Sequence, residues 1–153
     1  TGVQNLMQYT ENVNTESTED IPLEGLHALI AEDNELNLEI AKLMLEEKGI
    51  CVECAADGKE AVAKFEESEP GYDMIFMDIM MPYMNGWDAT RKIRTLQRPD
   101  ADKIPIIAMS ANAFAEDIIN SHISGMNWHL TKPIDADKMM TALKECIRKN
   151  NIR

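Results

Sequence analysis

The chain has 153 residues, 44% of them hydrophobic, which is enough for one domain with a sizeable core. Its 27 acidic and 15 basic residues give a net charge of −12, so we expect no direct contact with nucleic acid or with an anionic membrane surface. No apolar run approaches the roughly 20 residues of a membrane span, and the first residues show no signal-peptide pattern.

The first 24 residues differ in composition from the rest of the chain. They hold five acidic residues and no Lys or Arg, are rich in Thr, Asn, Glu and Ser, and show no apolar period. This composition predicts an acidic flexible linker or tail over residues 1–24, with weak support for a short helix around Leu6 and Met7. Because Thr1 stands in place of Met, we expect a piece of a longer protein.

From residue 25 onward, short apolar runs alternate with segments of helical period. The predicted strands cover residues 26–31, 50–55, 73–77, 104–109 and 126–130. Apolar spacing and capping residues predict helices over 34–48, from 57 to about 67, from 86 to about 96, over 113–124 and from the cap Asp135 through Ile147.

A strand followed by a helix, repeated five times, predicts a parallel sheet with helices on its faces. Near-continuous apolar strands fit a sheet that is buried on both sides. Residues 25–150 are too few for an eight-stranded barrel. The expected fold is therefore α/β, a doubly wound (βα)5 flavodoxin-like sheet with strand order 2-1-3-4-5.

Polar side chains follow four of the five predicted strands. They are Glu32 and Asp33 after the first strand, Asp78 after the third, Ser110 after the fourth, and Thr131 and Lys132, followed by Pro133, after the fifth. Because parallel strands end at one edge, where open α/β sheets bind ligands, we expect these side chains to converge. The second strand ends in Ala55, Ala56 and Asp57; as an edge strand it should lie away from the site.

Three carboxylates held together repel one another unless a cation neutralises them. Oxygen ligands suit Mg²⁺, with Mn²⁺ as an alternative, and a metal, a hydroxyl and a lysine together suit phosphoryl transfer to an Asp nucleophile. Each residue also has an ordinary interpretation: Glu32 and Asp33 as acids at a helix N-terminus, Ser110 as a helix cap, Lys132 as a surface lysine. Their coincidence on matching strand ends favours a site.

The stretches that carry these residues resemble the receiver domain of two-component signalling systems, most closely the receivers of hybrid sensor histidine kinases. They occur in the family's order and span nearly all of residues 26–147. The matching stretches are AEDNELN (31–37), MDIMMP (77–82), NG (85–86), AMSANA (108–113), GMN (125–127) and LTKP (130–133). The resemblance implies a receiver domain over residues 25–150.

The resemblance assigns a role to each residue of the predicted site. It makes Asp78 the phosphoacceptor and a metal ligand, Asp33 a direct Mg²⁺ ligand, Glu32 a ligand through water, and the Met80 backbone carbonyl a further ligand. It also makes Ser110 the switch hydroxyl, Lys132 the cation that pairs with the phosphoryl group, and Pro133 a proline preceded by a cis bond.

Two positions depart from the family pattern. The second switch position, usually aromatic, is His129, which makes aromatic-switch signalling less certain and also suits a partly buried histidine at a strand end. Trp128 stands where such receivers often carry a small acid, and both an exposed contact residue and a packing residue fit there.

Other patterns carry little functional signal. Cys51 and Cys54 form a lone CxxC without the second pair that a zinc site needs, and the three cysteines suit a reducing cytoplasm. We therefore expect a cytoplasmic location, with tethering to a membrane sensor through the parent chain as an option. No Gly-rich phosphate loop is present, so we expect no nucleotide cofactor.

The expected function is that of a phosphorelay receiver. Asp78 would accept a phosphoryl group from a histidine kinase core or a His-containing phosphotransfer domain, and Ser110 would then shift the surface over strands four and five. Because only six residues follow Ile147, we expect no output domain downstream, as at the C-terminus of a hybrid kinase; a stand-alone response regulator is the alternative.

Two rivals share the fold or the carboxylates. One is a pseudo-receiver that binds partners without accepting phosphate, and the other is a metal-dependent phosphatase. The phosphatase lacks a second Asp two residues after Asp78, where Met80 stands. Whether the chain counts as an enzyme stays open, because a receiver catalyses only its own phosphoryl transfer and the kinase activity would belong to the full-length parent.

Overall fold

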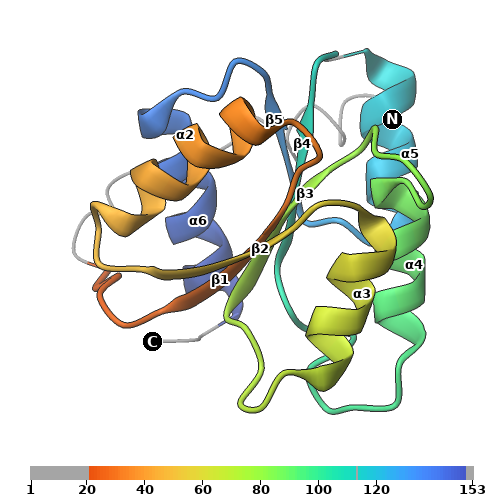
Figure 1. The fold of residues 1–153 in the computed structure, drawn as a ribbon, viewed down its shortest axis with the longest axis horizontal. Helices are drawn as coiled ribbons and strands as arrows, with labels where there is room; N and C mark the ends of the chain where they lie inside the picture. Colours follow the sequence, from red (N-terminus) through yellow and green to blue (C-terminus); the bar gives the residue numbers. More distant parts are fainter. Residues whose placement is uncertain (1–20, 113, 151–153) are drawn as a thin grey trace.

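The computed structural model describes residues 21–112 and 114–150. The predicted helix around Leu6 and most of the predicted linker lie outside these residues. The described part forms one five-stranded parallel sheet with strand order β2-β1-β3-β4-β5, so the predicted fold class and strand order are confirmed (Figure 1). The strands are β1 (His27–Ala31), β2 (Cys51–Ala55), β3 (Met74–Asp78), β4 (Ile106–Ser110) and β5 (Trp128–Thr131).

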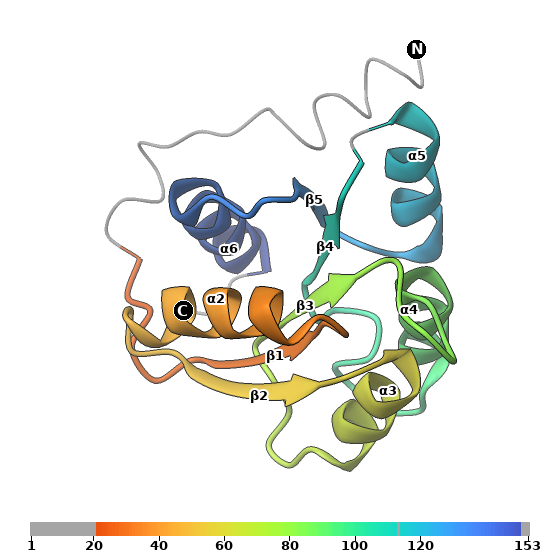
Figure 2. The ribbon, with the colours of Figure 1, turned by 45° about the horizontal axis from the view of Figure 1, so that its top comes forward.

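The helices cover both faces of this sheet. They are α2 (Glu35–Glu46), α3 (Gly58–Glu67), α4 (Gly86–Thr95), α5 (Ala115–Ser124) and α6 (Ala136–Asn150). Helices α2 and α6 lie on one face, and α3, α4 and α5 lie on the other (Figures 1 and 2). No helix among the described residues is long and apolar enough to cross a bilayer.

Short polar side chains begin the helices where the sequence indicates caps. The Asp57 carboxylate accepts the backbone N–H of Glu60 at 2.8 Å at the start of α3, as the predicted capping box requires. Asn34 and Asn85 cap α2 and α4 in the same way, and Asp135 accepts the N–H of Asp137 before α6. Local chemistry therefore fixes where each of these helices begins.

The central strands alternate between two apolar layers. In β3, Met74 and Phe76 pack in the layer beneath α2 and α6, whereas Ile75 and Met77 pack in the layer beneath α3 and α4. All four side chains are 0–1% exposed. Because both faces of the sheet are covered, both sets must be apolar, which explains the unbroken apolar runs.

The ends of some elements differ from the prediction. Strand β4 begins at Ile106 and not at residue 104, because Pro105 has no N–H for the ladder, although its carbonyl accepts the N–H of Ile75. Asp78 and Ser110 are the last residues of their strands and do not follow them. Leu23 is buried, so packing begins inside the segment that its composition marks as a linker.

Trp128 is a packing residue, which decides between the two interpretations of this position. Its side chain is 4% exposed and belongs to the apolar layer beneath α6. The ammonium of Lys149 lies 5.6 Å from the centre of the indole ring. A surface contact role for Trp128 is therefore excluded in this fold.

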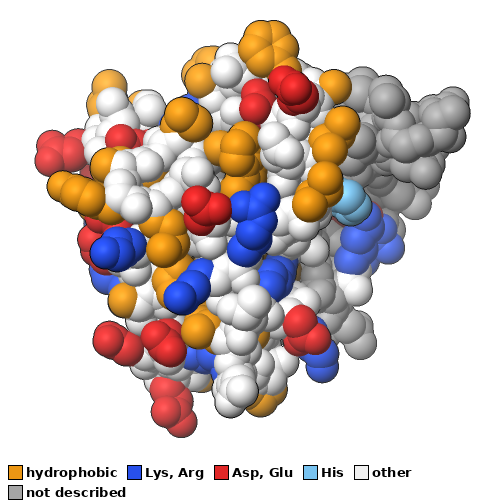
Figure 3. Space-filling model, turned by 90° about the vertical axis from the view of Figure 1, so that its right-hand side faces the viewer, with side chains coloured by type: hydrophobic (Ala, Val, Ile, Leu, Met, Phe, Trp, Pro, Cys, Tyr) orange, Lys and Arg blue, Asp and Glu red, His pale blue; other side chains and the backbone are white. Residues whose placement is uncertain are grey.

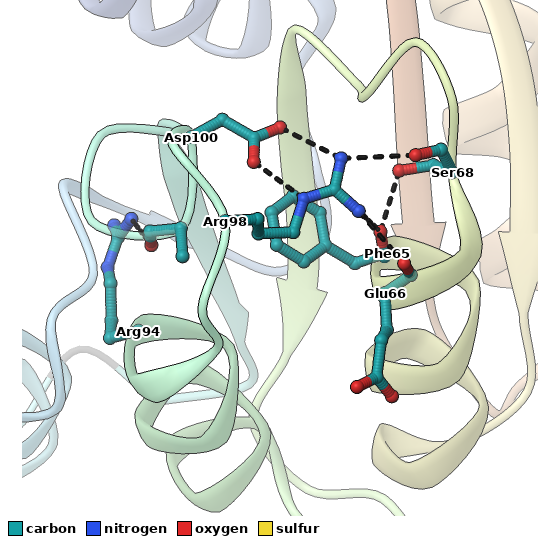
Figure 4. A network of polar contacts seen from close by, with 7 residues as sticks. Phe65, Glu66, Ser68, Arg94, Arg98 and Asp100 are labelled. Carbon is teal, nitrogen blue, oxygen red and sulfur yellow. Dashed lines mark hydrogen bonds and ion pairs between the residues drawn. The ribbon is translucent and has the colours of Figure 1, made fainter.

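A polar network around Arg98 ties two loops together at the N-terminal ends of the strands (Figure 4). The guanidinium donates to the backbone carbonyls of Phe65, Glu66 and Ser68 and to the Asp100 carboxylate, and it lies 4.5 Å from the Phe65 ring centre. A cavity of about 390 Å³ opens beside it. Because protein oxygens already occupy the Arg98 donors, this cavity offers no free guanidinium to an anion.

Candidate functional site

The strand register brings the predicted residues to one edge of the sheet. Ala31 of β1 pairs with Met77 of β3. The residues that follow them, Glu32 and Asp78, therefore lie side by side. On the other side Asp78 pairs with Met109, and Ser110 pairs with Thr131, the residue before Lys132. The strand register therefore confirms the prediction that these residues converge.

Lys132 holds two buried carboxylates together. Its Nζ lies 2.7 Å from Oε1 of Glu32 and 3.2 Å from Oδ1 of Asp78. Glu32 is 2% exposed and Asp78 is 4% exposed, so neither acid is an ordinary surface group. Lys132 is therefore not a surface lysine, and Glu32 is not merely an acid near a helix N-terminus.

Asp78 and Glu32 have opposite electrostatic environments. Burial, together with the hydrogen bond and the negative charge of Glu32, raises the pKa of Asp78 to about 7. Burial also acts to raise the pKa of Glu32, but hydrogen bonds with Lys132 and Asp78 outweigh it and lower that pKa. Asp78 is therefore the acid of this pair that takes up a proton as the pH falls through the neutral range, while Glu32 stays ionised beside Lys132.

Asp33 completes a group of three carboxylates. It is exposed, and one oxygen from each of Glu32, Asp33 and Asp78 lies within 4.8 Å of the others. An all-oxygen donor set of this size fits a hard divalent cation, which would favour the ionised form of Asp78. The pKa of Lys132 is raised above its usual value. Burial acts to lower this pKa, but the hydrogen bond to Glu32 and the charge of Asp78 outweigh that effect, so Lys132 stays cationic.

Ser110, the last residue of β4, bonds to the loop that follows the strand and does not cap a helix. Its hydroxyl donates to the Asn112 carbonyl at 2.8 Å and accepts the Asn112 N–H at 3.0 Å. Helix α5 begins after Phe114, which makes no side-chain cap. The backbone N–H of Lys132 donates to the Ser110 carbonyl at 2.6 Å, so this loop is joined to the site lysine.

His129 lies behind this loop. It is 6% exposed, and its Nε2 lies 3.3 Å from the Asn112 carbonyl, which the Ser110 hydroxyl also contacts. Burial lowers the pKa of His129, so the ring is neutral at pH 7 and donates through Nε2. Its Nδ1 has no hydrogen-bond partner among the described residues.

The other predicted residues lie in the loops after β3 and β5 and at the start of α3. Met80 is 75% exposed in the loop after Asp78, and the Lys132–Pro133 peptide bond is cis. Asp57 caps α3 beyond the edge strand β2 and does not join the carboxylates. Cys51 is exposed, Cys54 is half-buried, and both are free thiols.

The structure adds contacts that the sequence analysis missed. A Cβ on Gly86 would lie 2.2 Å from the Asp78 carbonyl oxygen, so only glycine allows α4 to begin against the backbone of Asp78. The Asn85-Gly86 pair signals a loop, but its closeness to Asp78 has no signal in one sequence. The Trp87 indole N–H donates to Ser121, 34 residues away, and no local pattern predicts this bond.

Comparison with known proteins places this site in a family. The model of the response regulator receiver domain matches residues 28–144. A probable histidine kinase 2 from rice is 39% identical over 82% of this chain, and the osmosensing histidine protein kinase SLN1 of Saccharomyces cerevisiae is 38% identical over 89%. The chain spans 13% and 11% of the lengths of these relatives.

Solved structures agree with this match. The receiver domain of the sensor histidine kinase PA1611 from Pseudomonas aeruginosa, solved with a magnesium ion in its active-site cleft, is 36% identical, with a TM-score of 0.73 over 81% of this chain and 98% of its own. The receiver domain of the Francisella response regulator 1452 is 30% identical, with a TM-score of 0.72 over 82% of this chain and 98% of its own.

Proposed function

The chain belongs to the response regulator receiver domain family, and from this premise we propose that Asp78 is its phosphoacceptor. The observation that carries the proposal is the junction of Glu32, Asp78 and Lys132, in which one ammonium lies within 3.2 Å of two buried carboxylates. Such an arrangement supplies both a nucleophilic oxygen and a cation for the group it receives.

Each side chain has a distinct task in this transfer. An oxygen of Asp78 attacks the phosphorus of a phosphohistidine, the P–N bond breaks, and the imidazole nitrogen keeps the electron pair. Lys132 stays charged throughout and pairs with the incoming oxygens. The Ser110 hydroxyl leaves Asn112 to donate to the new acyl phosphate, which shifts the loop that leads into α5.

We propose that Asp33, Asp78, Glu32 and the Met80 backbone carbonyl hold a Mg²⁺ ion. The cluster of three carboxylates supports this assignment, and the receiver of PA1611 binds magnesium in its own cleft. When bound, Mg²⁺ neutralises charge on the transferring phosphoryl group.

The surface of α2 beside the site supports a proposal about the partner. Leu36, Ile40 and Leu43 are 69%, 41% and 53% exposed and lie at i, i+4 and i+7 on α2, where they form an apolar stripe that starts one turn after Asp33. The acidic residues Glu35, Glu39 and Glu46 lie on the same helix and outnumber its one basic residue, Lys42. A partner helix with an apolar ridge and basic flanks fits this stripe.

We therefore propose that a histidine kinase core or a His-containing phosphotransfer domain docks on α2 and presents its phosphohistidine to Asp78. We also propose that residues 25–150 act as one receiver unit within a longer hybrid kinase, with the preceding acidic residues as its tether. The curated relatives are histidine kinases, which supports this context.

Acid-stable, base-labile phosphorylation tests the assignment. Acetyl phosphate with Mg²⁺ should add one phosphoryl mass to the wild type and none to Asp78→Asn. Asp73→Asn, at the entrance to β3, is the matched control and should label normally. Equal labelling of Asp78→Asn would refute the phosphoacceptor assignment, and no labelling of any variant would favour the pseudo-receiver.

A further inference from the structure

Helix α4 begins in direct contact with Asp78. The backbone N–H of Gly86 donates to the Ile79 carbonyl at 2.8 Å, and the Cα of Gly86 leaves no room for a side chain above the Asp78 carbonyl. The first residue of α4 is therefore hydrogen-bonded to Ile79, the residue that follows Asp78. A change in the Asp78 backbone is passed to the first turn of α4 through packed atoms.

The next residue links α4 to α5. Trp87 is half-buried, packs against the apolar layer beneath α3 and α4, and donates its indole N–H to the Ser121 hydroxyl at 3.0 Å. Ser121 is fully buried, so water does not compete for this bond. Helices α4 and α5 lie next to each other in both ribbon views (Figures 1 and 2).

Helix α5 has a second anchor to α4 at its C-terminal end, where the Arg94 guanidinium donates to the carbonyl of Gly125, the C-cap of α5. Its buried residues are Ile118, Ser121 and Ser124, so only one of them is a large apolar side chain. Its N-cap, Phe114, makes no side-chain cap and is 66% exposed. Since α5 buries so little apolar surface, its N-terminal part is displaced at low cost, and the Trp87 bond to its buried face holds it between that free N-terminus and the C-cap fixed by Arg94.

We propose that the Trp87–Ser121 hydrogen bond transmits the state of Asp78 to α5, as a route separate from the Ser110 loop at the N-terminus of that helix. Trp87 acts as a positioning residue: it touches no reacting atom but sets where the second turn of α5 lies. The inference rests on the proposed function of Asp78. Because Ile123 is 69% exposed on this helix, a shift of α5 moves an apolar side chain on the surface.

Beryllofluoride with Mg²⁺, a mimic of the phosphoryl group, tests this route by NMR. In the wild type it should shift the Trp87 indole N–H signal, the amides of residues 110–112 and those of residues 118–124. In Trp87→Phe and in Ser121→Ala, the shifts over 118–124 should shrink while those over 110–112 persist. A coupling of this kind changes the equilibrium between the two positions of α5 by about 2- to 30-fold.

Two controls match these variants. Ser124→Ala removes another buried hydroxyl of α5, one that bonds only within its own helix, to the Ser121 carbonyl. Trp128→Phe removes the other indole, which lies in the opposite apolar layer. Both should respond like the wild type, and Trp128→Phe also assigns the two indole signals.

The outcomes separate this inference from the proposed function. If the amides around Asp78 respond but 118–124 shift equally in wild type, Trp87→Phe and Ser121→Ala, the route through Trp87 is wrong and the phosphoacceptor assignment stands. If Ser124→Ala loses the response as fully as Ser121→Ala, general loosening of α5 explains the data and the proposal fails. If the wild type shows no response near Asp78, both fail.

Discussion

A single ammonium decides the chemistry of the carboxylates at the residue scale. Lys132 Nζ is nearer to Glu32, at 2.7 Å, than to Asp78, at 3.2 Å, and Glu32 consequently has the lowered pKa of the pair while that of Asp78 is raised. Of the two buried acids, Asp78 is therefore the one that protonates first as the pH falls. A divalent cation held by the three carboxylates would favour the ionised form of Asp78, the form that the proposed attack on phosphorus requires.

His129 adds a pH-dependent contribution to stability. Burial lowers its pKa in the folded state, whereas the unfolded chain binds a proton near pH 6.5. Between the folded and unfolded pKa values the unfolded state holds more protons, so the stabilisation by neutral His129 is present above pH 6.5 and is lost as the pH falls through the folded pKa.

We therefore predict that His129→Gln flattens the pH dependence of the free energy of unfolding. Urea titrations of wild type and variant between pH 5 and 7.5 should diverge, with a slope difference of at most about 1.4 kcal/mol per pH unit for one proton. Gln keeps a donor for the Asn112 carbonyl but cannot titrate. Parallel curves for the two proteins would show that His129 binds its proton equally in both states.

At the scale of elements, the exposed stripe on α2 makes a prediction about partner choice. Ile40→Glu places a charge in the middle of the stripe, so phosphotransfer from a His-containing phosphotransfer domain that labels the wild type should slow by about 10-fold. Labelling by acetyl phosphate, which needs no docking, should be unchanged. Ile123→Glu makes the same change on α5, where the side chain is 69% exposed, and should transfer at the wild-type rate.

If both variants slow phosphotransfer equally, added negative charge and not the stripe is responsible. If Ile40→Glu transfers normally, the partner approaches Asp78 without contacting α2. Radiolabelled transfer over short times separates these cases, because equilibrium labelling hides differences in rate.

The Arg98 network makes a prediction about stability. Its guanidinium joins the end of α3 to the loop before β4, and its side chain is 19% exposed (Figure 4). Arg98→Ala removes the guanidinium donors from the Glu66 and Ser68 carbonyls and from the Asp100 carboxylate, and should lower the free energy of unfolding by about 2–4 kcal/mol. Arg91→Ala, which breaks a pair with Asp88 at 50% exposure, should cost about 0–1 kcal/mol in the same urea titration.

An equal loss of unfolding free energy in the two variants would mean that water replaces the Arg98 hydrogen bonds as readily as it replaces those of an exposed ion pair. Because the network lies at the far end of the strands from Asp78, acetyl phosphate labelling should persist in Arg98→Ala. Loss of labelling with intact folding would contradict that separation.

The comparison of sequence and structure shows which contacts are local. The period of the apolar residues and caps such as Asp57 predict each element because these signals act within a few residues. The strand ends then bring Asp78, Ser110 and Lys132 together, because a parallel sheet has one carboxyl edge. Thus the site was predictable from the order of elements and the chemistry of the residues that end them.

Contacts between helices and loops were not predictable in this way. The bonds from Arg98 to Glu66 of α3 and from Trp87 to Ser121 join residues 32 and 34 positions apart. Both depend on how the helices sit on the sheet, and neither leaves a period or a cap in the sequence. Trp128 was undecided for the same reason, since only the packing of α6 over β5 shows that it is buried.

For the whole molecule, the net charge of −12 is unevenly distributed. On the face over α4 and α5, Lys and Arg side chains gather across the middle with acidic side chains around them (Figure 3). The carboxylates of Glu32, Asp33 and Asp78 instead meet at one edge of the sheet. General screening by salt acts on the entire surface, whereas a divalent cation held by these oxygens acts at one place.

This difference predicts a stabilisation by Mg²⁺ that monovalent salt does not reproduce. A ligand bound only by the folded state adds RT ln(1 + [L]/Kd), or about 2.7 kcal/mol when its concentration is 100-fold above Kd. MgCl₂ should therefore raise the unfolding midpoint of the wild type more than NaCl at equal ionic strength.

In Asp33→Asn the excess stabilisation by MgCl₂ should vanish, because an exposed ligand is removed without disturbing the buried pair of Glu32 and Asp78. Asp102→Asn changes the charge equally at an exposed loop position and should keep the full excess. An excess that survives in Asp33→Asn would place the cation elsewhere on the acidic surface, and the carboxylates would then be structural.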